Sequence, residues 1–161
     1  KLENKTDARG SFTRIYCKNN FKKLGLESKI LQINVSTNLK KGTARGFHYQ
    51  TKKFSEVKRV MVLQGKIFDV IIDTRKNSKT FGKKCTIVLS DKKKEILFIP
   101  QGVAHAFQSL ENNTKIIYIN NNVYNKKSEK GFNINSKNLK ISWPIKNTYL
   151  SKKDSLLKDR E

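Results

Sequence analysis

Short apolar runs separated by polar turns dominate the pattern of this chain. Each run is four to six residues long and rich in Ile, Val and Phe, which favours β-strands over helices. Polar turn residues fall between the runs, as at 64–65 and 111–114, with a spacing typical of a β-sandwich or barrel. The runs that predict strands are 30–35, 60–63, 67–72, 85–89, 96–99 and 116–119.

Helices play a small part in this pattern. Two short helices are expected, at 21–26 and at 151–160, and neither is long enough to cover a parallel sheet. The 161 residues suit one domain, residues 1–161, without repeats or linkers. Apolar positions become rare near the end, so 131–161 is expected to form a C-terminal tail that wraps around the body. The sequence therefore predicts an all-β domain with short peripheral helices.

The charge of the chain is strongly positive. It has 35 Lys and Arg residues against 13 Asp and Glu, a formal net charge of +22, which is typical of proteins with nucleic-acid, membrane or anionic small-molecule partners. Only 6 of these 35 are Arg, however, and 16 Asn accompany the 29 Lys, so a solvated lysine-rich surface is the simpler interpretation. A nucleic-acid binder would more often concentrate guanidinium groups on one element. We therefore expect no nucleic-acid partner.

The cysteines and the apolar runs bear on the compartment. Cys17 and Cys85 lie far apart and outside any CxxC spacing, so neither a metal knuckle nor a redox motif is indicated. No apolar stretch approaches the ~20 residues that cross a bilayer, and the charged N-terminus lacks a signal-peptide core. We expect a cytoplasmic protein that makes no membrane contact.

Only two histidines occur, and both lie in segments expected to be extended. In RGFHYQ (45–50), alternation places His48 on one face with Gly46 and Gln50, and the two aromatic neighbours on the other face. His48 then points either to solvent or into a ligand cavity. His105 enters a strand after IPQGVA, and each histidine taken alone is also consistent with a structural role. A site of two histidines and one carboxylate would be conceivable, but Gln50 stands where a paired ligand is usual, so no metal site is expected.

Six segments, read in order, resemble the signatures of one enzyme family. They are RGFHYQ, QGKIFDVIIDTRKNSKTFGK, IPQGVAHAF, YNKKSEKGFNIN, ISWP and LSKKD, and with DARGSF they extend from residue 7 to residue 154. In this order and spacing they are similar to the dTDP-4-dehydrorhamnose 3,5-epimerase family. The resemblance implies a cupin-type jelly-roll barrel, a homodimer, and a site without metal or cofactor that takes a nucleotide-diphosphate 4-keto sugar.

The resemblance also implies roles for individual residues. His48 is expected to be the general base, Asp154 its carboxylate partner, and Tyr118 the acid on the other face of the sugar. Lys58 is expected near the keto oxygen. The residues expected to contact the nucleotide or the sugar are Arg9, Gln32, Asn34, Arg45, His105, Tyr124, Glu129 and Lys153.

The chemistry of a 4-keto sugar explains these residue types. Loss of a proton from C3 or C5 is favoured because the resulting carbanion delocalises onto O4 as an enolate. Epimerisation then needs a base on one face of the ring and a proton donor on the other. Imidazole suits the first role because its pKa lies near neutral, and a phenol that stays protonated at neutral pH suits the second. A fixed lysine would stabilise the enolate as its charge develops.

Three positions depart from the family pattern and keep alternatives open. Arg14 stands where the family usually has a Glu that contributes to nucleotide binding, Val57 replaces a usual glycine, and GVAHAF replaces GFAHGF. One alternative is a single-site 3- or 5-epimerase that acts on another nucleotide sugar, such as a GDP-linked deoxyheptose. The related 3,4-ketoisomerases would need a second histidine at Gln50. A non-enzymatic basic β-barrel that binds nucleic acid is the remaining alternative.

Overall fold

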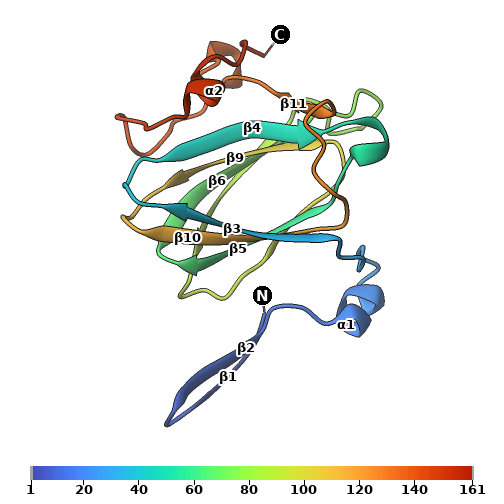
Figure 1. Cartoon of the computed structure of the whole chain (residues 1–161), viewed down its shortest axis with the longest axis vertical. Coiled ribbons are helices and arrows are strands. Elements are labelled where there is room, and N and C mark those ends of the chain that lie inside the picture. Colours follow the sequence, from blue (N-terminus) through green and yellow to red (C-terminus); the bar gives the residue numbers. More distant parts are fainter. Residues whose placement is uncertain (1, 161) are drawn as a thin grey trace.

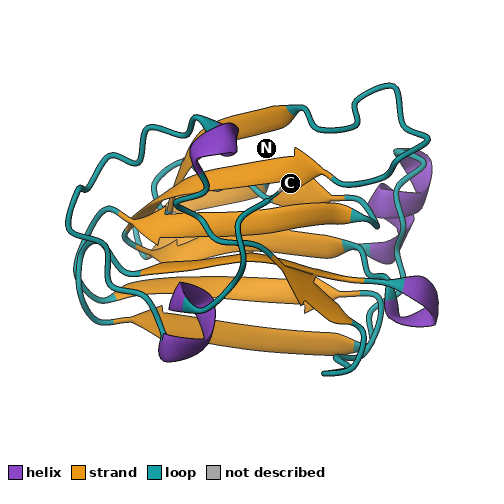
Figure 2. Ribbon diagram, turned by 90° about the horizontal axis from the view of Figure 1, so that it is seen from above, coloured by secondary structure: helices purple, strands orange, loops and turns teal. Residues whose placement is uncertain are grey.

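The computed structural model, which describes residues 2–160, is an antiparallel jelly roll with short peripheral helices (Figure 1, Figure 2). The all-β fold class expected from the apolar runs is confirmed. The helices are α1 (Lys18–Lys23), the 3-10 turns η1 (Lys52–Phe54) and η2 (Lys137–Leu139), and α2 (Lys152–Ser155). The strands are β1 (Glu3–Asp7), β2 (Gly10–Arg14), β3 (Gln32–Asn38), β4 (Ala44–Gln50), β5 (Lys58–Gln64), β6 (Lys66–Asp73), β7 (Lys84–Ser90), β8 (Leu97–Ile99), β9 (Val103–Ser109), β10 (Thr114–Asn120) and β11 (Glu129–Gly131).

Two sheets make the body of the molecule. One has the strand order β3-β10-β5-β8 and the other β11-β4-β9-β6-β7, and their strands pair antiparallel. Many neighbours, such as β4 and β9, are distant in sequence, as in other jelly rolls. Figure 1 shows β4, β9 and β6 in one layer and β3, β10 and β5 in the layer below it. Side chains from distant parts of the chain therefore face one another across the interior.

Alternation along the strands divides the apolar residues between two clusters. Along β9, Phe107 belongs to the cluster between the sheets, whereas Ala104 and Ala106 belong to a cluster on the outer face of the five-stranded sheet. Full burial of one such aliphatic or aromatic side chain stabilises a fold by about 1.5–3 kcal/mol. The cluster between the sheets consists of Val60, Val62, Ile67, Leu89, Ile99, Val103, Phe107 and Ile116.

The C-terminal segment covers the outer face of the five-stranded sheet. Phe132, Ile134 and Leu139 are buried there, and the ring of Phe132 stacks on Phe47 with 4.7 Å between centroids. The indole N–H of Trp143 donates to the carbonyl of Ile134 at 3.0 Å, so this partly buried polar atom keeps a partner. The packed segment leads to α2, which lies beside β4.

Both helices differ from those that the pattern predicted. α1 lies earlier than 21–26 because Gly25, with φ of +66°, adopts the left-handed conformation that ends helices. α2 is much shorter than the expected 151–160. The backbone beyond it bonds to the tail instead, since the N–H of Asn133 donates to the carbonyl of Lys158 at 2.8 Å. Tertiary hydrogen bonds therefore override the helical pattern at this end of the chain.

The hairpin of β1 and β2 was not predicted, and it extends away from the barrel (Figure 1). Its strands ENKTD and GSFTR contain a single apolar residue, Phe12, so apolar alternation gives no signal there. Phe12 is 68% exposed. The hairpin therefore contributes little to the core of its own chain.

Candidate active site

A polar cleft with two lobes lies between the sheets. The first lobe, of about 310 Å³, is here called the amide lobe, and the second, of about 350 Å³, the cationic lobe. Three side chains, those of His48, Lys58 and Tyr118, line both lobes and so lie at their junction. The amide lobe is otherwise lined by Gln32, Asn34, Tyr49, Gln50, Glu56, Asn120, Tyr124 and Glu129, and the cationic lobe by Ser36, Arg45, His105, Phe107, Ser151, Lys153 and Asp154.

The three junction residues come from both sheets. His48 lies on β4 of the five-stranded sheet, whereas Lys58 and Tyr118 lie on β5 and β10 of the four-stranded sheet. Phe47 and Tyr49 pack with the outer cluster, so the side chain between them turns inward. Of the two orientations that alternation allowed for His48, the one into a cavity is found. An imidazole and a phenol therefore reach the cleft from opposite sides.

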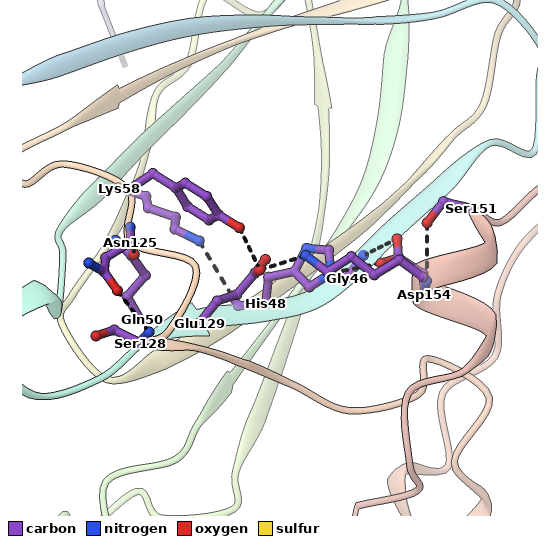
Figure 3. Close-up of polar contacts among 11 residues, drawn as sticks. Gly46, His48, Gln50, Lys58, Asn125, Ser128, Glu129, Ser151 and Asp154 are labelled. Carbon is purple, nitrogen blue, oxygen red and sulfur yellow. Dashed lines mark hydrogen bonds and ion pairs between the residues drawn. The ribbon is translucent and has the colours of Figure 1, made fainter.

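His48 is hydrogen-bonded to a carboxylate. Its Nε2 lies 2.8 Å from Oδ1 of Asp154, and the two side chains are 25% and 5% exposed. Asp154 belongs to α2, where its backbone N–H donates to Oγ of the capping residue Ser151 at 3.1 Å. The N–H of Gly46 donates to the other carboxylate oxygen at 3.4 Å. Figure 3 shows this chain of contacts from Ser151 through Asp154 to His48.

The electrostatics of this pair define which nitrogen can act as a base. Burial by itself would raise the pKa of Asp154, but the hydrogen bond and charge of His48, with the amide of Gly46 and the charge of Lys153, lower it below its usual value. The carboxylate is therefore ionised at neutral pH and can only accept hydrogen bonds. Nε2 of His48 therefore donates to this carboxylate, which leaves Nδ1 as the ring nitrogen that can exchange a proton with a ligand.

The phenol of Tyr118 has a pKa well above its ordinary value. Burial is the main cause, the negative charge of Asp69 adds to it, and Arg45 opposes it. Asp69 is fully buried and its Oδ2 lies 2.7 Å from Nε2 of His105, whose ring centroid is 6.2 Å from that of Tyr118. The phenol therefore stays protonated at neutral pH and is available as a proton donor.

Lys58 places a cation at the junction of the lobes. Its Nζ lies 3.3 Å from Oε1 of Glu56 and donates to the carbonyl of His48 at 3.4 Å. Burial raises the pKa of Glu56, and the nearby charge of Lys58 opposes that shift. A buried ammonium group needs such partners, because an isolated charge is costly to remove from water. Lys58 is thus held where it can meet negative charge that develops on a ligand.

Glu129 connects the two lobes. Its Oε2 accepts a hydrogen bond from the hydroxyl of Tyr124 at 2.9 Å and lies 2.5 Å from Nζ of Lys153. Burial would raise the pKa of Glu129, but these two bonds and the charge of His48 lower it. The carboxylate is therefore ionised and anchors Lys153 next to Asp154.

Two negative findings apply to residues 2–160. Within this range, no group of three or more His, Cys, Asp or Glu side chains is arranged to hold a metal ion. None of the helices in the same range is both long and apolar enough to cross a membrane.

Comparison with known proteins identifies the family. The sequence model of dTDP-4-dehydrorhamnose 3,5-epimerase matches residues 1–160. The chain belongs to this family. It is thus an enzyme of the isomerase class, as the ordered segments indicated. The dTDP-4-dehydrorhamnose 3,5-epimerase of Shigella flexneri is 38% identical to this enzyme over 149 residues, which cover 92% of this chain and 82% of the relative.

Solved structures of the family have the same fold as this enzyme. The Bacillus anthracis dTDP-4-dehydrorhamnose 3,5-epimerase with TDP and PPi bound is 36% identical, with a TM-score of 0.96 over 99% of this chain and 91% of that one. The Legionella pneumophila dTDP-6-deoxy-D-glucose-3,5-epimerase in complex with dTDP-4-keto-L-rhamnose is 33% identical, with a TM-score of 0.92 over 98% and 84%. The cupin-type jelly roll implied by the resemblance is therefore confirmed.

The enzyme gathers the expected site residues in one place, with a single exception. Every one of them except Arg9 lines the two lobes of the cleft. Arg9 lies on the β1–β2 hairpin, where its guanidinium group contacts the carboxylate of Asp7 at 2.7 Å. Arg9 therefore does not reach the cleft of its own chain.

Sequence reasoning missed two carboxylates of the site, Glu56 and Asp69. Glu56 lies two residues before Lys58, so the alternation used for His48 would have found it on the inward face. Asp69 comes close to His105 through the pairing of β6 with β9. No local pattern in the sequence shows that pairing.

Proposed function

We propose that the enzyme epimerises a nucleoside-diphosphate-linked 4-keto-6-deoxy sugar at C3 and C5, and that it converts dTDP-4-dehydro-6-deoxyglucose to dTDP-4-dehydrorhamnose. The main support is the junction of the lobes, where a carboxylate-paired histidine, a lysine and a protonated phenol meet from opposite sheets. The relatives add support, because one was solved with TDP and PPi and another with dTDP-4-keto-L-rhamnose.

The first half of the reaction is proton removal. Nδ1 of His48 takes the proton from the carbon next to the ketone, and the electron pair of that C–H bond moves onto O4 to form the enolate. Asp154 stabilises the imidazolium that results, and Lys58 stabilises the enolate. Interactions that strengthen only as this charge develops raise the rate rather than the affinity.

The second half is proton return on the opposite face. The Tyr118 hydroxyl donates its proton to the same carbon. The electron pair of the enolate C=C bond forms the new C–H bond, and an electron pair on O4 re-forms the ketone. His48 then loses its proton to solvent and Tyr118 regains one. The carbon is thereby inverted, and its hydrogen is exchanged with water.

Binding groups for the rest of the substrate surround the junction. Arg45 and Lys153 supply the cations that a diphosphate requires. The amides of Gln32 and Asn34 offer donors and acceptors to the nucleotide or the sugar.

We also propose a cytoplasmic homodimer. Ile33 and Val35 on the edge strand β3 are 57% and 58% exposed, and Phe12 on the hairpin is more exposed still. A second copy would cover this apolar surface, and Arg9 would then contact the cleft of the second copy instead of its own. The free thiols of Cys17 and Cys85 fit a reducing compartment such as the cytoplasm.

The proposed dimer predicts a mass in solution near twice the 18.6 kDa of one chain, measured on a sizing column, and a monomeric mass would contradict it.

Proton NMR in deuterated water, with a panel of dTDP- and GDP-linked 4-keto sugars, tests the proposed reaction. We expect deuterium at both C3 and C5 of the dTDP-linked 6-deoxyglucose derivative, together with the doubly inverted product. Exchange at one carbon only would establish the single-site alternative. Absence of exchange in every sugar of the panel would refute the proposed epimerisation.

A further inference from the structure

Two lysine-bearing segments border the opening of the amide lobe. Tyr124, which lines this lobe, is 53% exposed, so the lobe meets solvent there. One segment is η1, and the other is the loop 121–128 between β10 and β11, both at the right-hand end of the barrel in Figure 1. Their exposed lysines, here called the rim lysines, are Lys52, Lys53, Lys126 and Lys127.

The buried side chain of Gln50 fixes both segments to the lobe. Its Nε2 donates to the carbonyls of Phe54 and Val123 at 3.1 Å each, and its Oε1 accepts from the N–H of Asn125 at 2.6 Å. The segments are also tied to each other, since the N–H of Thr51 donates to the carbonyl of Ser128 at 3.0 Å. Figure 3 shows Gln50 with Asn125 and Ser128 on the side of the cleft that holds Lys58. The rim lysines are therefore held at the opening rather than on independent loops.

The charges of the rim lysines are not compensated. Among residues 2–160, no carboxylate lies within 4.0 Å of any of these four ammonium groups, and neither segment contains Asp or Glu. The two acids of the adjoining lobe are already paired, Glu56 with Lys58 and Glu129 with Lys153. A ligand that approaches the opening therefore meets an excess of positive charge.

We propose that the rim lysines form an electrostatic capture surface for the nucleoside diphosphate of the substrate, and that they speed its entry without taking part in the chemical step. This inference rests on the proposed function, because it requires an anionic substrate. A cleft bordered by one sign of charge can raise association rates by roughly 10 to 10³. The effect depends on distance, since exposed charges are screened beyond about 8 Å at physiological ionic strength.

The competing explanation is that these lysines are part of a surface that is basic everywhere. With a net charge of +22, the loss of any four lysines would then slow substrate capture to the same extent. A matched set at the opposite end of the barrel distinguishes the two explanations. Exposed lysines in the turns and strand ends farthest from Gln50 are Lys41, Lys92, Lys93 and Lys115.

The test compares two quadruple variants, one with the four rim lysines changed to Gln and one with the four distant lysines changed to Gln. We expect the rim variant to lose about tenfold in kcat/KM at low ionic strength, with kcat within twofold of the parent. The loss should shrink as salt is raised, and the distant variant should stay within twofold in kcat/KM. Equal losses in the two variants, an unchanged kcat/KM in the rim variant, or a fall in its kcat would each overturn the proposal.

A binding measurement separates this inference from the proposed reaction. The Kd of thymidine diphosphate, titrated at several salt concentrations, should rise about as much as kcat/KM falls in the rim variant and hardly change in the distant one. If the parent enzyme turned over no 4-keto sugar but showed this difference in Kd, the reaction would be refuted and the capture surface would stand. If the parent turned over its substrate and both variants bound thymidine diphosphate alike, the capture surface would be refuted and the proposed reaction would stand. Equal melting temperatures for the two variants serve as the control for folding.

Discussion

Replacement of His48 by alanine is expected to abolish deuterium incorporation at C3 and C5, with a loss of at least about 10²–10⁴ in rate. The reason is that Nε2 of His48 is bonded to Asp154, so that Nδ1 is the nitrogen that can take the proton at the junction of the lobes. Binding of thymidine diphosphate should remain measurable, because Arg45 and Lys153 are untouched. The measurement is proton NMR of the 4-keto sugar in deuterated water.

A second variant, His48→Gln, distinguishes loss of the base from loss of the fold. His48→Ala leaves Asp154, only 5% exposed, without the partner that stabilises its charge, and an unpaired buried carboxylate is destabilising. His48→Gln keeps an N–H donor for that carboxylate but has no basic nitrogen. Both variants should therefore lose exchange, and His48→Gln should keep more of the stability of the parent. Exchange at the rate of the parent in a folded variant would refute His48 as the base.

Local alternation predicted that His48 faces away from its two aromatic neighbours, but it left open whether that face is the inner or the outer one. The aromatic residues on either side needed an apolar environment, and Phe47 finds it under the C-terminal tail at 0% exposure. The side chain between them then has to face the other way. The same rule, applied from Lys58 backwards, would have revealed Glu56.

The position of Arg45 shows where strict alternation fails. Arg45 and His48 are separated by an odd number of positions, yet both line the cationic lobe. The register of β4 with β9 shifts between them, and Gly46 takes a φ of +117° there. A Cβ at Gly46 would come within 2.5 Å of the carbonyl oxygen of His105, so only glycine fits. The family resemblance placed Arg45 in the pocket, whereas periodicity alone would have placed it outside.

Contacts between distant segments are the part that the sequence did not reveal. Asp69 meets His105 only because β6 and β9 pair in one particular register. Arg9 was expected at the site, but the hairpin that carries it projects from the barrel, and no property of DARGSF shows this. Local patterns thus predict which way a side chain points, while pairing and docking decide what it meets.

The change of Tyr118 to phenylalanine is expected to separate proton removal from inversion. The substitution removes only the hydroxyl oxygen, and no hydrogen bond of that hydroxyl is found within residues 2–160, so the fold should be retained. His48 can still form the enolate, and solvent deuterium can return from the face of His48. Exchange should therefore continue, while the inverted product forms about 10²-fold more slowly or more, because its proton donor is lost.

The ratio of exchange to inversion, measured in one NMR time course, is the decisive quantity. Tyr124→Phe is the matched control, since it removes a hydroxyl from the same cleft that bonds to Glu129 rather than facing the junction. That change should affect substrate binding but leave the ratio as in the parent. A parent-like ratio in Tyr118→Phe would show that another group donates the proton. Because the raised pKa of Tyr118 keeps the phenol protonated, its loss should be felt across the neutral pH range rather than at one edge of it.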